Sequence, residues 1–578
     1  MTTIETGAGD WPTLPAMFFA QAARKASKPF LWAKRGGAWR AQSWGEVAAQ
    51  ARTLARGLTA LGLNPGDRVV LVSENRPEWL IADIAIMAAG CITVPAYVTN
   101  TADDHLHVLN NSGARAALVS TTRLAQRLLP AAVRAGQLET VIALEKPELD
   151  QSLGVDLRTW QEIEDLGVGA AGEDGGAEPS AGKREDTACI IYTSGTGGAP
   201  KGVMLSHGAI LSNCANTRYT LRHLHFNNEV FLSFLPLSHS YEHTAGQFLP
   251  IMLGAQIYYA EGADTVVSNM AEARPTLMTA VPRFYETLQQ RISHGVNRAG
   301  GYRKKLFDRT LELGRARYLA PESLGLGARI TDAMLTLLVR RSIARRFGGR
   351  LKAFISGGAP LNYEVGLFFT ALGIRTLQGY GQTETAPIVS CNPPEKVNLL
   401  TVGPPIPDAE VRIAEDGEIL VRGELMMQGY WQDAEATAAA IRDGWIHTGD
   451  IGALDDDGYL HITDRKKDII VNSGGDNVSP QRIEGILSLE PEIAQAMVYG
   501  DRKPYLVALI VADAAADGEI GNAVKRVNAK LSPLERIRHF AVAPEPFAIT
   551  NGQLTPTLKI RRHVITEIYR DDIEGLYK

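Results

Sequence analysis

The chain has 578 residues and a formal net charge of −5 at pH 7, with 45% hydrophobic and 21% charged residues. This composition is typical of a folded globular protein and excludes disordered and fibrous classes, while the length exceeds one hydrophobic core and predicts at least two domains. The acidic balance lacks the basic excess of nucleic-acid binders. The four cysteines are scattered without a CxxC pair, which argues against a disulfide framework and against a zinc site.

Neither an export signal nor a membrane span is recognisable in the sequence. Residues 1–11 lack the basic stretch and apolar stretch of an export signal. The most apolar candidate for a span, residues 81–94, is interrupted by Asp83. We therefore expect a cytoplasmic protein whose membrane contact, where it exists, is peripheral and at the inner membrane face.

The first part of the chain alternates amphipathic helix with short β-branched strands. Residues 44–61 predict a helix, and residues 68–72 and 116–119 predict strands. Residues 167–186 are rich in Gly, Ala, Glu and Ser, a composition typical of a flexible connector. The α/β pattern resumes over residues 189–380.

Later segments differ from this pattern. Short strands and turns over residues 403–429 predict a small β subdomain, and a domain boundary is expected at residues 464–467. Beyond it, residues 477–487 predict a capped helix, and residues 496–499 and 505–511 predict strands. The remainder fits an α+β unit of about 110 residues, a normal domain size.

Residues 193–201, which we call the phosphate loop, follow the apolar run 187–192. The loop combines three hydroxyl residues, three glycines and Lys201 in the string TSGTGGAPK. Glycines let backbone N–H groups approach phosphate oxygens, hydroxyls donate hydrogen bonds to them, and lysine supplies a compact cation. The loop differs from a P-loop because no Gly-Lys-Ser/Thr follows. A different kind of triphosphate site is predicted.

The string YTSGTGGAPKG at residues 192–202 resembles the signature of the adenylate-forming superfamily, which includes acyl-CoA synthetases, luciferases and adenylation domains. This resemblance implies an α/β multidomain protein that uses ATP and Mg²⁺. It implies an N-terminal adenylation domain, residues 1–464, built of two α/β subdomains and a small β-barrel-like subdomain. A hinge, 465–467, and a mobile α+β C-terminal domain, 468–578, follow. Within the phosphate loop it assigns nucleotide contacts to Thr193, Ser194, Gly195, Thr196, Gly197 and Lys201.

Two further motifs resemble the adenine wall and the second nucleotide motif of that superfamily, SGGAP at 356–360 and QGYGQTET at 378–385. The resemblance implies that Tyr380 stacks on the purine and that Glu384 holds Mg²⁺ together with Thr196. It makes Glu384, Thr196 and Lys201 catalytic residues beside the mobile lysine described next. The nucleotide contacts implied here are Gly357, Gly358, Ala359, Gln378, Gly379, Tyr380, Gly381 and Thr383.

The remaining superfamily motifs follow in order. GWIHTGD at 444–450 implies that Asp450 accepts the ribose hydroxyls, and TDRKKDII at 463–470 implies that Arg465 contacts the nucleotide while the backbone rotates at Lys467. NGQLTPTLKIRR at 551–562 resembles the motif of the mobile catalytic lysine, here Lys559, which also binds the nucleotide. Leu558 stands where many relatives have glycine, a variation associated with long-chain enzymes. The CoA channel is expected at Ser473, Gly474 and Gly475.

Weaker sequence signals indicate which carboxylic acid is the substrate. FLPLSHSYEHTAGQ at 234–247 resembles the acyl-pocket motif of long-chain fatty acyl-CoA synthetases, which assigns the pocket to His239, Tyr241 and Gly358. His239 and His243 at i and i+4 suggest a metal pair only if a third ligand is present, and none is visible. A packed helix with hydrogen-bonded histidines is the other reading of this segment.

Residues 302–352 are basic, in contrast to the acidic chain as a whole. They contain 13 Lys or Arg against four Asp or Glu, interleaved with leucines. They predict amphipathic helices. Such a surface fits either contact with anionic lipid or an ordinary solvated face, and the sequence leaves both open.

The sequence thus predicts an AMP-forming long-chain fatty acid–CoA ligase that uses ATP, Mg²⁺ and coenzyme A. The alternatives are an acyl-AMP ligase that loads a carrier protein, a CoA ligase for medium-chain or aryl acids, and a non-catalytic sensor of acyl groups or nucleotides. Lys201, Glu384, Asp450 and Lys559 argue against the sensor because all four are present. Luciferase chemistry and the oligomeric state stay open, with a homodimer allowed.

Overall fold

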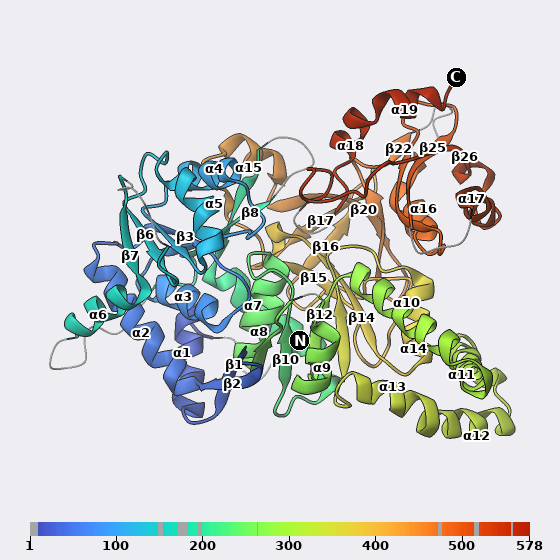
Figure 1. The fold of residues 1–578 in the computed structure, drawn as a ribbon, viewed down its shortest axis with the longest axis horizontal. Helices are drawn as coiled ribbons and strands as arrows, with labels where there is room; N and C mark the ends of the chain where they lie inside the picture. Colours follow the sequence, from blue (N-terminus) through green and yellow to red (C-terminus); the bar gives the residue numbers. More distant parts are fainter. Residues whose placement is uncertain are drawn as a thin grey trace.

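The computed structural model describes residues 10–147, 154–171, 182–193, 199–262, 264–471, 477–513, 519–555 and 559–578. Two large mixed sheets with their helices form the main body, a smaller antiparallel sheet lies beside them, and a C-terminal unit occupies one end (Figure 1). The expected α/β multidomain class is therefore confirmed.

One large sheet carries the phosphate loop. Apart from the edge strand β7, its parallel strands are buried on both faces, as expected for the apolar runs that form them. Its strand order is β18 (Gly429–Tyr430), β9 (Lys201–Ser206), β8 (Thr187–Thr193), β4 (Ile92–Ala96), β3 (Arg68–Val72), β5 (Ala116–Val119), β6 (Thr140–Ala143) and β7 (Asp156–Thr159).

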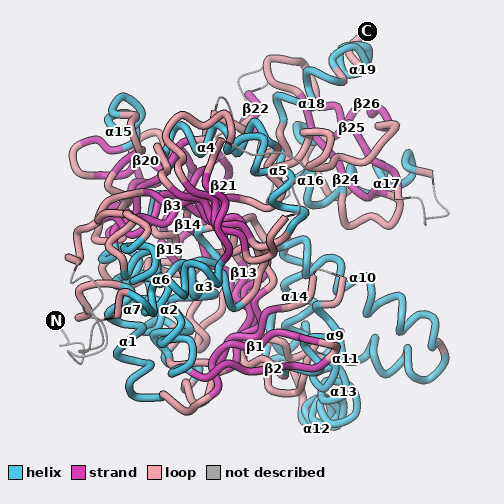
Figure 2. The backbone as a smooth tube through the Cα atoms, turned by 60° about the vertical axis from the view of Figure 1, so that its left-hand side comes forward, coloured by secondary structure: helices cyan, strands magenta, loops and turns pink. Residues whose placement is uncertain are grey.

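The second large sheet carries the two later nucleotide motifs on β13 and β14. Its strand order is β15 (Ile388–Cys391), β14 (Thr376–Gly381), β13 (Ala353–Ser356), β12 (Leu277–Ala280), β10 (Val230–Ser233), β11 (Gln256–Tyr259), β1 (Pro29–Arg35) and β2 (Ala38–Ser43). The strands of both sheets run through the middle of the molecule with helices on either side (Figure 2).

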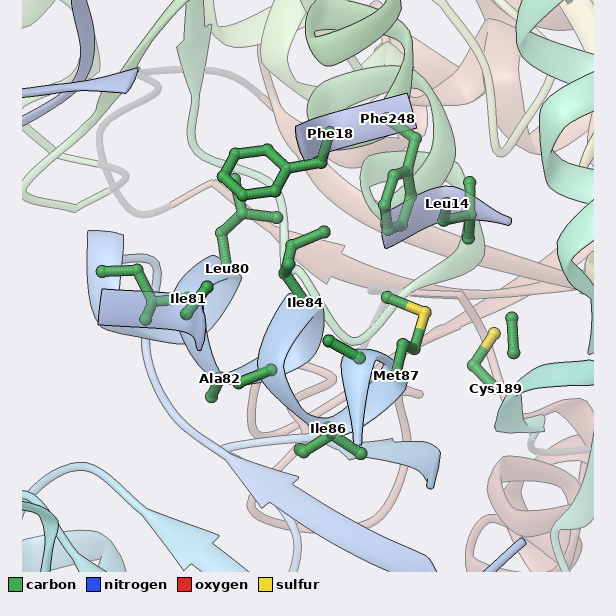
Figure 3. Packing of buried hydrophobic residues seen from close by; sticks show 14 of the residues in the cluster. Leu14, Phe18, Leu80, Ile81, Ala82, Ile84, Ile86, Met87, Cys189 and Phe248 are labelled. Atoms are coloured by element: carbon green, nitrogen blue, oxygen red, sulfur yellow. The ribbon is translucent and has the colours of Figure 1, made fainter. Parts of the chain in front are cut away.

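A shared core lies between the two sheets. Helix α3 (Pro77–Ala88) is apolar almost all round, the pattern of a helix with no solvent face. Leu80 and Ile84 of α3 pack with Phe18 of α1 (Leu14–Lys25) and Phe248 (Figure 3). Burying one such side chain contributes about 1.5–3 kcal/mol. This core fixes the two sheets relative to each other.

The other helices of the main body cover the outer faces or line the core. They are α2 (Trp44–Ala60), α4 (Ala102–Ser112), α5 (Thr122–Ala132), α6 (Trp160–Gly169), α7 (His207–Thr220), the π-helix η2 (Glu242–Phe248), α8 (Leu249–Leu253), α9 (Val266–Ala273), α10 (Pro282–Ala299) and α14 (Tyr363–Ala371). The basic segment forms α11 (Gly301–Leu319), α12 (Leu326–Leu335), the π-helix η4 (Thr336–Arg340) and α13 (Arg341–Arg346), and α11 and α12 project from the body in both views (Figures 1 and 2).

The smaller sheet and the C-terminal unit follow. The sheet contains β16 (Glu410–Ile413), β17 (Glu418–Arg422), β20 (Trp445–Leu454), β19 (Ile441–Arg442) and β21 (Leu460–Arg465), with α15 (Ala434–Ala440) beside it. The C-terminal unit contains β22 (Ile470–Val471), β23 (Asn477–Val478), α16 (Pro480–Leu487), β24 (Ile493–Tyr499), β25 (Leu506–Ala512), α17 (Ile520–Asn528), β26 (Ile537–Val542), α18 (Arg562–Ile568) and α19 (Arg570–Gly575). It has its own apolar clusters on both faces of β24–β25–β26.

Two sequence expectations need correction. The connector predicted from residue 167 begins later, because α6 continues to Gly169, and Gly167 packs so closely on α2 that a Cβ would meet the Thr53 carbonyl oxygen at 1.9 Å. The capped helix predicted from residue 477 begins at Pro480 with Ser479 as its N-cap, because Asn477 and Val478 pair with β22 instead. Most of the connector, residues 172–181, lies outside the described residues.

Candidate active site

The phosphate loop is the turn of a β-hairpin. Strands β8 and β9 pair antiparallel, and their register brings Thr193 opposite Lys201. Residues 194–198 lie outside the described residues, so the roles of Ser194, Gly195, Thr196 and Gly197 stay predictions. The hairpin nevertheless fixes both ends of the loop at the edge of a buried sheet.

Lys201 lies beside two residues that the motifs did not include. Its Nζ is 3.6 Å from Asp433 Oδ2 and 5.2 Å from the centre of the Tyr430 ring. The Lys201 side chain is 46% exposed, so the ion pair with Asp433 is worth little and the ammonium stays available to an anion.

Glu384 lies opposite the loop, in the 3-10 turn η5 (Thr383–Thr385) that follows β14. Its Oε1 accepts a hydrogen bond of 2.9 Å from the Tyr430 hydroxyl. Burial, followed by the charge of Glu384, raises the pKa of Tyr430, so the hydroxyl keeps its proton and acts as a donor. Sequence reasoning missed Tyr430 because only the pairing of β18 with β9 brings it to this place.

Glu384 also bears on metal binding. Among the described residues, no three His, Cys, Asp or Glu side chains cluster as a metal cage. Mg²⁺ in nucleotide sites is usually held by one or two protein oxygen ligands and the phosphates, so a cage is not required. The donor set fits Mg²⁺, because the second carboxylate oxygen of Glu384 has no hydrogen-bond or ion-pair partner within the described part of the chain.

Asp450 is the anchor of a second cluster. It is buried on β20, and its carboxylate accepts from the Tyr380 hydroxyl at 2.6 Å and from Arg465 Nε at 2.9 Å. The antiparallel register of β20 and β21 places Arg465 directly across from Asp450. Each carboxylate oxygen retains a further lone pair, so Asp450 can still accept a ligand hydroxyl.

Lys559 reaches this cluster from the C-terminal unit. Its loop is held by a bridge between Leu554 and Ile560 and by a 2.8 Å hydrogen bond from Thr555 N to the Lys559 carbonyl. Lys559 is exposed, yet the surrounding protein removes part of its hydration, and this desolvation followed by Arg465 lowers the pKa of Lys559. Asp450 and Glu384 are close enough to oppose that shift. The charges of Lys559, Arg465, Asp450 and Glu384 therefore act on one another.

The predicted acyl-pocket residues also lie together. The Tyr241 hydroxyl donates to the Ile355 carbonyl at 2.8 Å, and a Cβ on Gly357 would lie 3.1 Å from the Tyr241 ring. Gly358, next in the chain, has φ +82°, a conformation that favours glycine. The predicted residues Tyr241 and Gly358 are thus neighbours at the end of β13.

The two histidines of this segment have different surroundings. His239 Nδ1 accepts from the Tyr241 N–H at 3.1 Å, and burial followed by the charge of Lys559 lowers the pKa of His239 to about 3. It is therefore neutral at physiological pH. His243 Nε2 lies 2.9 Å from Asp83 Oδ2, and both side chains are fully buried. His243 is a hydrogen-bonded core residue on η2.

The remaining predicted residues are distributed as follows. Gln378 is turned to the backbone, since its Oε1 accepts from Leu361 N and its Nε2 donates to the Thr401 carbonyl. Gly379 and Gly381 pair with β15, Thr383 Oγ1 lies 2.9 Å from Ser240 Oγ, and Ala359 is exposed at the end of β13. Lys467 is exposed in the turn after β21, and Ser473, Gly474 and Gly475 lie outside the described residues.

None of the helices in the described part of the chain is both long enough and apolar enough to cross a membrane.

The fold resembles that of an anthranilate CoA ligase in complex with anthranoyl-AMP, with a TM-score of 0.76, 19% identity, and coverage of 98% of this chain and 100% of that one. It also resembles the adenylation domain of a carboxylate reductase from Mycobacterium chelonae, with a TM-score of 0.75, 21% identity, and coverage of 99% and 92%.

Sequence comparison gives closer relatives. Long-chain-fatty-acid–CoA ligase FadD15 of Mycobacterium tuberculosis is 34% identical over 566 residues, covering 94% of this chain and 93% of that protein. Long chain acyl-CoA synthetase 6, peroxisomal, of Arabidopsis thaliana is 31% identical over 592 residues, covering 94% and 82%. The model of the AMP-binding enzyme family matches residues 18–431, and that of the AMP-binding enzyme C-terminal domain matches residues 467–578. The resemblance to adenylate-forming enzymes is confirmed, and the chain belongs to the AMP-binding enzyme family.

Proposed function

We propose that the protein is an AMP-forming ligase that activates a long-chain fatty acid with ATP and transfers the acyl group to coenzyme A. The observation that carries this proposal is the buried Asp450 carboxylate held by Tyr380 and Arg465, with the charge of Lys559 from the C-terminal unit acting on both Asp450 and Glu384. The names of the relatives in Mycobacterium and Arabidopsis support the choice of acid and of coenzyme A.

The first half reaction must give the fatty acid a better leaving group, because a free carboxylate would have to expel oxide. One carboxylate oxygen attacks the α-phosphorus of ATP, the bond to the β-phosphate breaks, and pyrophosphate leaves. Lys559 stabilises the charge that gathers on the α-phosphate oxygens, and Lys201 balances charge on the phosphates behind it. Mg²⁺ held by Glu384, together with Thr196, would neutralise further phosphate charge.

The other residues position the reactants. Asp450 accepts hydrogen bonds from the ribose, and its two protein donors fix its orientation. Tyr380 faces the purine, and Arg465 contacts the nucleotide from β21. His239 is neutral beside Lys559, so it accepts a hydrogen bond without repelling the lysine.

In the second half reaction the thiolate of coenzyme A attacks the acyl carbon of the adenylate, and AMP leaves with the bonding electron pair. We propose that the C-terminal unit rotates at the hinge residue Lys467, withdraws Lys559 and presents the loop containing Ser473, Gly474 and Gly475. Such gating by a hinge is common in enzymes that use one pocket twice.

A substrate panel tests the reaction and the acid. The protein is incubated with ATP, Mg²⁺, coenzyme A and acids from acetate to oleate, with aryl acids included, and AMP and thioesters are quantified by mass spectrometry. We expect AMP and thioester in equal amounts, with preference for long chains. Preference for medium-chain or aryl acids would contradict the long-chain proposal. AMP with acyl transfer only to a carrier protein would indicate the acyl-AMP ligase alternative, and no ATP–pyrophosphate exchange would indicate a sensor.

We also propose peripheral contact of a cytoplasmic protein with the inner membrane face, through α12 and η4. Leu326, Ile330, Met334, Leu337 and Leu338 follow helical spacing and are 56–77% exposed. Exposed arginines flank this apolar stripe at positions 329, 341, 345 and 346. Asp332 is the one carboxylate over residues 323–352, and it is buried against Arg340. An apolar stripe with a basic rim fits an anionic lipid surface.

Vesicle pelleting tests this contact at moderate salt. We expect binding to vesicles of phosphatidylcholine with phosphatidylglycerol, weaker binding to phosphatidylcholine alone, and loss of binding when Leu326, Ile330 and Met334 are changed to Ser. The control changes Val133, Val168 and Leu534 to Ser, which are exposed apolar residues elsewhere. Equal binding by the two triple variants, or no binding by the wild type, would contradict the proposal.

A further inference from the structure

Tyr430 connects the two charged groups on the phosphate side of the site. Its ring lies 5.2 Å from Lys201 Nζ, and its hydroxyl donates to Glu384 Oε1 at 2.9 Å. Lys201 comes from β9 and Glu384 from the turn after β14, so the two belong to different sheets. Within the described part of the chain, Tyr430 is the hydrogen-bond partner of the Glu384 carboxylate, whereas Met427 N donates to the Glu384 carbonyl at 2.8 Å.

The backbone around Tyr430 is held on both sides. Its N–H donates to Thr437 Oγ1 at 2.9 Å, and Trp431 N donates to the Gly202 carbonyl at 2.7 Å. The Trp431 indole N–H donates to the Asn111 carbonyl at 3.0 Å. The backbone that carries the ring is therefore anchored to the sheet of the phosphate loop, where Tyr430 pairs with Val203.

The chemistry of the side chain suits both neighbours. The phenol has one proton, and donating it to Oε1 leaves the other oxygen of Glu384 free for a cation. The negative face of the ring attracts the Lys201 ammonium without neutralising it, and the ion pair of Lys201 with Asp433, at 3.6 Å between partly exposed side chains, is weak. One side chain thus orients an anion toward a metal and a cation toward phosphate.

We propose that Tyr430 is a positioning residue that sets the spacing between Lys201 and Glu384, so that the triphosphate and its divalent cation bind together. This inference rests on the proposed ATP-dependent function and adds a residue that the superfamily motifs did not supply. The hydroxyl acts through Glu384 on the cation, and the ring acts through Lys201 on the phosphates. The two parts can be removed separately.

The test measures binding instead of turnover. The full-length protein is titrated with α,β-methylene ATP, whose α–β linkage the reaction cannot cleave, with and without Mn²⁺ in place of Mg²⁺. Bound Mn²⁺ is followed by electron paramagnetic resonance, and nucleotide binding by calorimetry. The variants are Tyr430→Phe, which keeps the ring, and Tyr430→Leu, which removes ring and hydroxyl.

Tyr459 provides a matched control. Tyr459 is buried, its hydroxyl donates to the Lys396 carbonyl at 2.8 Å, and Lys396 Nζ lies 5.5 Å from its ring centre. Tyr459→Phe and Tyr459→Leu therefore remove the same two kinds of contact away from the site. Neither control variant should change nucleotide or Mn²⁺ affinity.

For Tyr430→Phe we expect metal-free nucleotide affinity within about twofold of wild type and Mn²⁺ affinity in the ternary complex lowered about tenfold, since a hydrogen bond to a charged group is lost. Tyr430→Leu should also lower metal-free nucleotide affinity about threefold, because the cation–π contact is lost.

Unchanged Mn²⁺ affinity in Tyr430→Phe would overturn the proposal. If Tyr430→Phe loses nucleotide affinity equally with and without metal, the proposal is also overturned, because such a loss indicates a merely structural role. If Tyr430→Leu does not fold by circular dichroism, Tyr430→Phe alone decides. A wild-type protein that binds no nucleotide contradicts the proposed function itself, whereas wild-type binding with an unaffected Tyr430→Phe contradicts only the role of Tyr430.

Discussion

Asp450 and Lys559 face the same space, but different kinds of structure hold them. Asp450 is buried on a strand, and two side-chain donors within 2.9 Å fix its carboxylate. Lys559 is exposed on a loop whose described contacts are a two-residue bridge and hydrogen bonds with Thr555. The acceptor side is rigid by packing, whereas the position of the lysine depends on how the C-terminal unit docks.

The described contacts that dock the C-terminal unit on the main body include two long hydrogen bonds. Arg283 donates to the Ala494 carbonyl at 3.5 Å and Asn362 to the Gly485 carbonyl at 3.4 Å, both long hydrogen bonds. Leu489 packs against the apolar cluster of the main body, yet a cavity of about 550 Å³ remains between α10 and the C-terminal unit. This difference supports the proposal that a fixed set of acceptors works with a lysine that the C-terminal unit can withdraw.

The largest effect is expected when the Lys559 cation is removed. We expect Lys559→Ala to lower the rate of adenylate formation by at least about 100-fold, because a preorganised charge at the transition state is lost. Thioester formation from supplied acyl-adenylate should stay within about twofold of wild type. Single-turnover measurements of each half reaction check this. Lys525→Ala, an exposed lysine in the same unit, is the control, and equal loss of both half reactions would refute the assignment.

A second prediction concerns Glu242, a buried carboxyl group in the packed main body. Glu242 on η2 is fully buried and accepts from Ser233 and Thr279, and burial raises its pKa from 4.5 to about 7 despite those two hydrogen bonds. Because the folded-state pKa is above the unfolded value, this group's stabilisation is complete below pH 4.5 and is lost as pH rises through 7.

Glu242→Gln should therefore remove a pH-dependent loss of roughly 2 kcal/mol in the free energy of unfolding between pH 5 and pH 8. Urea unfolding of wild type and variant at both pH values measures the difference. The exposed Glu322→Gln serves as the control and should follow the wild-type curve. A Glu242→Gln variant with the full wild-type pH dependence would show that the carboxyl is already ionised in the folded protein.

The smallest expected effect concerns the apolar contact between the C-terminal unit and the main body. Leu489→Ala removes apolar contact between the C-terminal unit and the main body, so Lys559 should spend less time over the site. We expect adenylate formation to slow about threefold to fivefold, while thioester formation from supplied adenylate does not slow, since an apolar contact of about 1 kcal/mol shifts a population by this factor. Leu534→Ala, a 54% exposed leucine of the same unit, should change neither rate. Slowing of both half reactions by Leu489→Ala would point to a folding defect.

Sequence patterns predicted some elements closely. The β-branched runs at 68–72 and 116–119 form β3 and β5 with those bounds, because buried parallel strands need continuous apolar residues. The capped helix expected over residues 477–487 ends where predicted but begins three residues later, since Asn477 and Val478 pair with a strand that no local signal indicates. Short segments follow their tertiary partners when propensity is weak.

The sequence by itself determined the family and the candidate residues Lys201, Glu384, Asp450 and Lys559, because each belongs to a contiguous motif whose residue types suit phosphate, metal or ribose. The tertiary structure alone decided which of them meet and what orients them. It showed Gln378 turned to the backbone, His243 paired with Asp83, and Tyr430 joined to Glu384. These contacts join residues 17 to 160 positions apart, and only strand pairing and core packing bring such residues together.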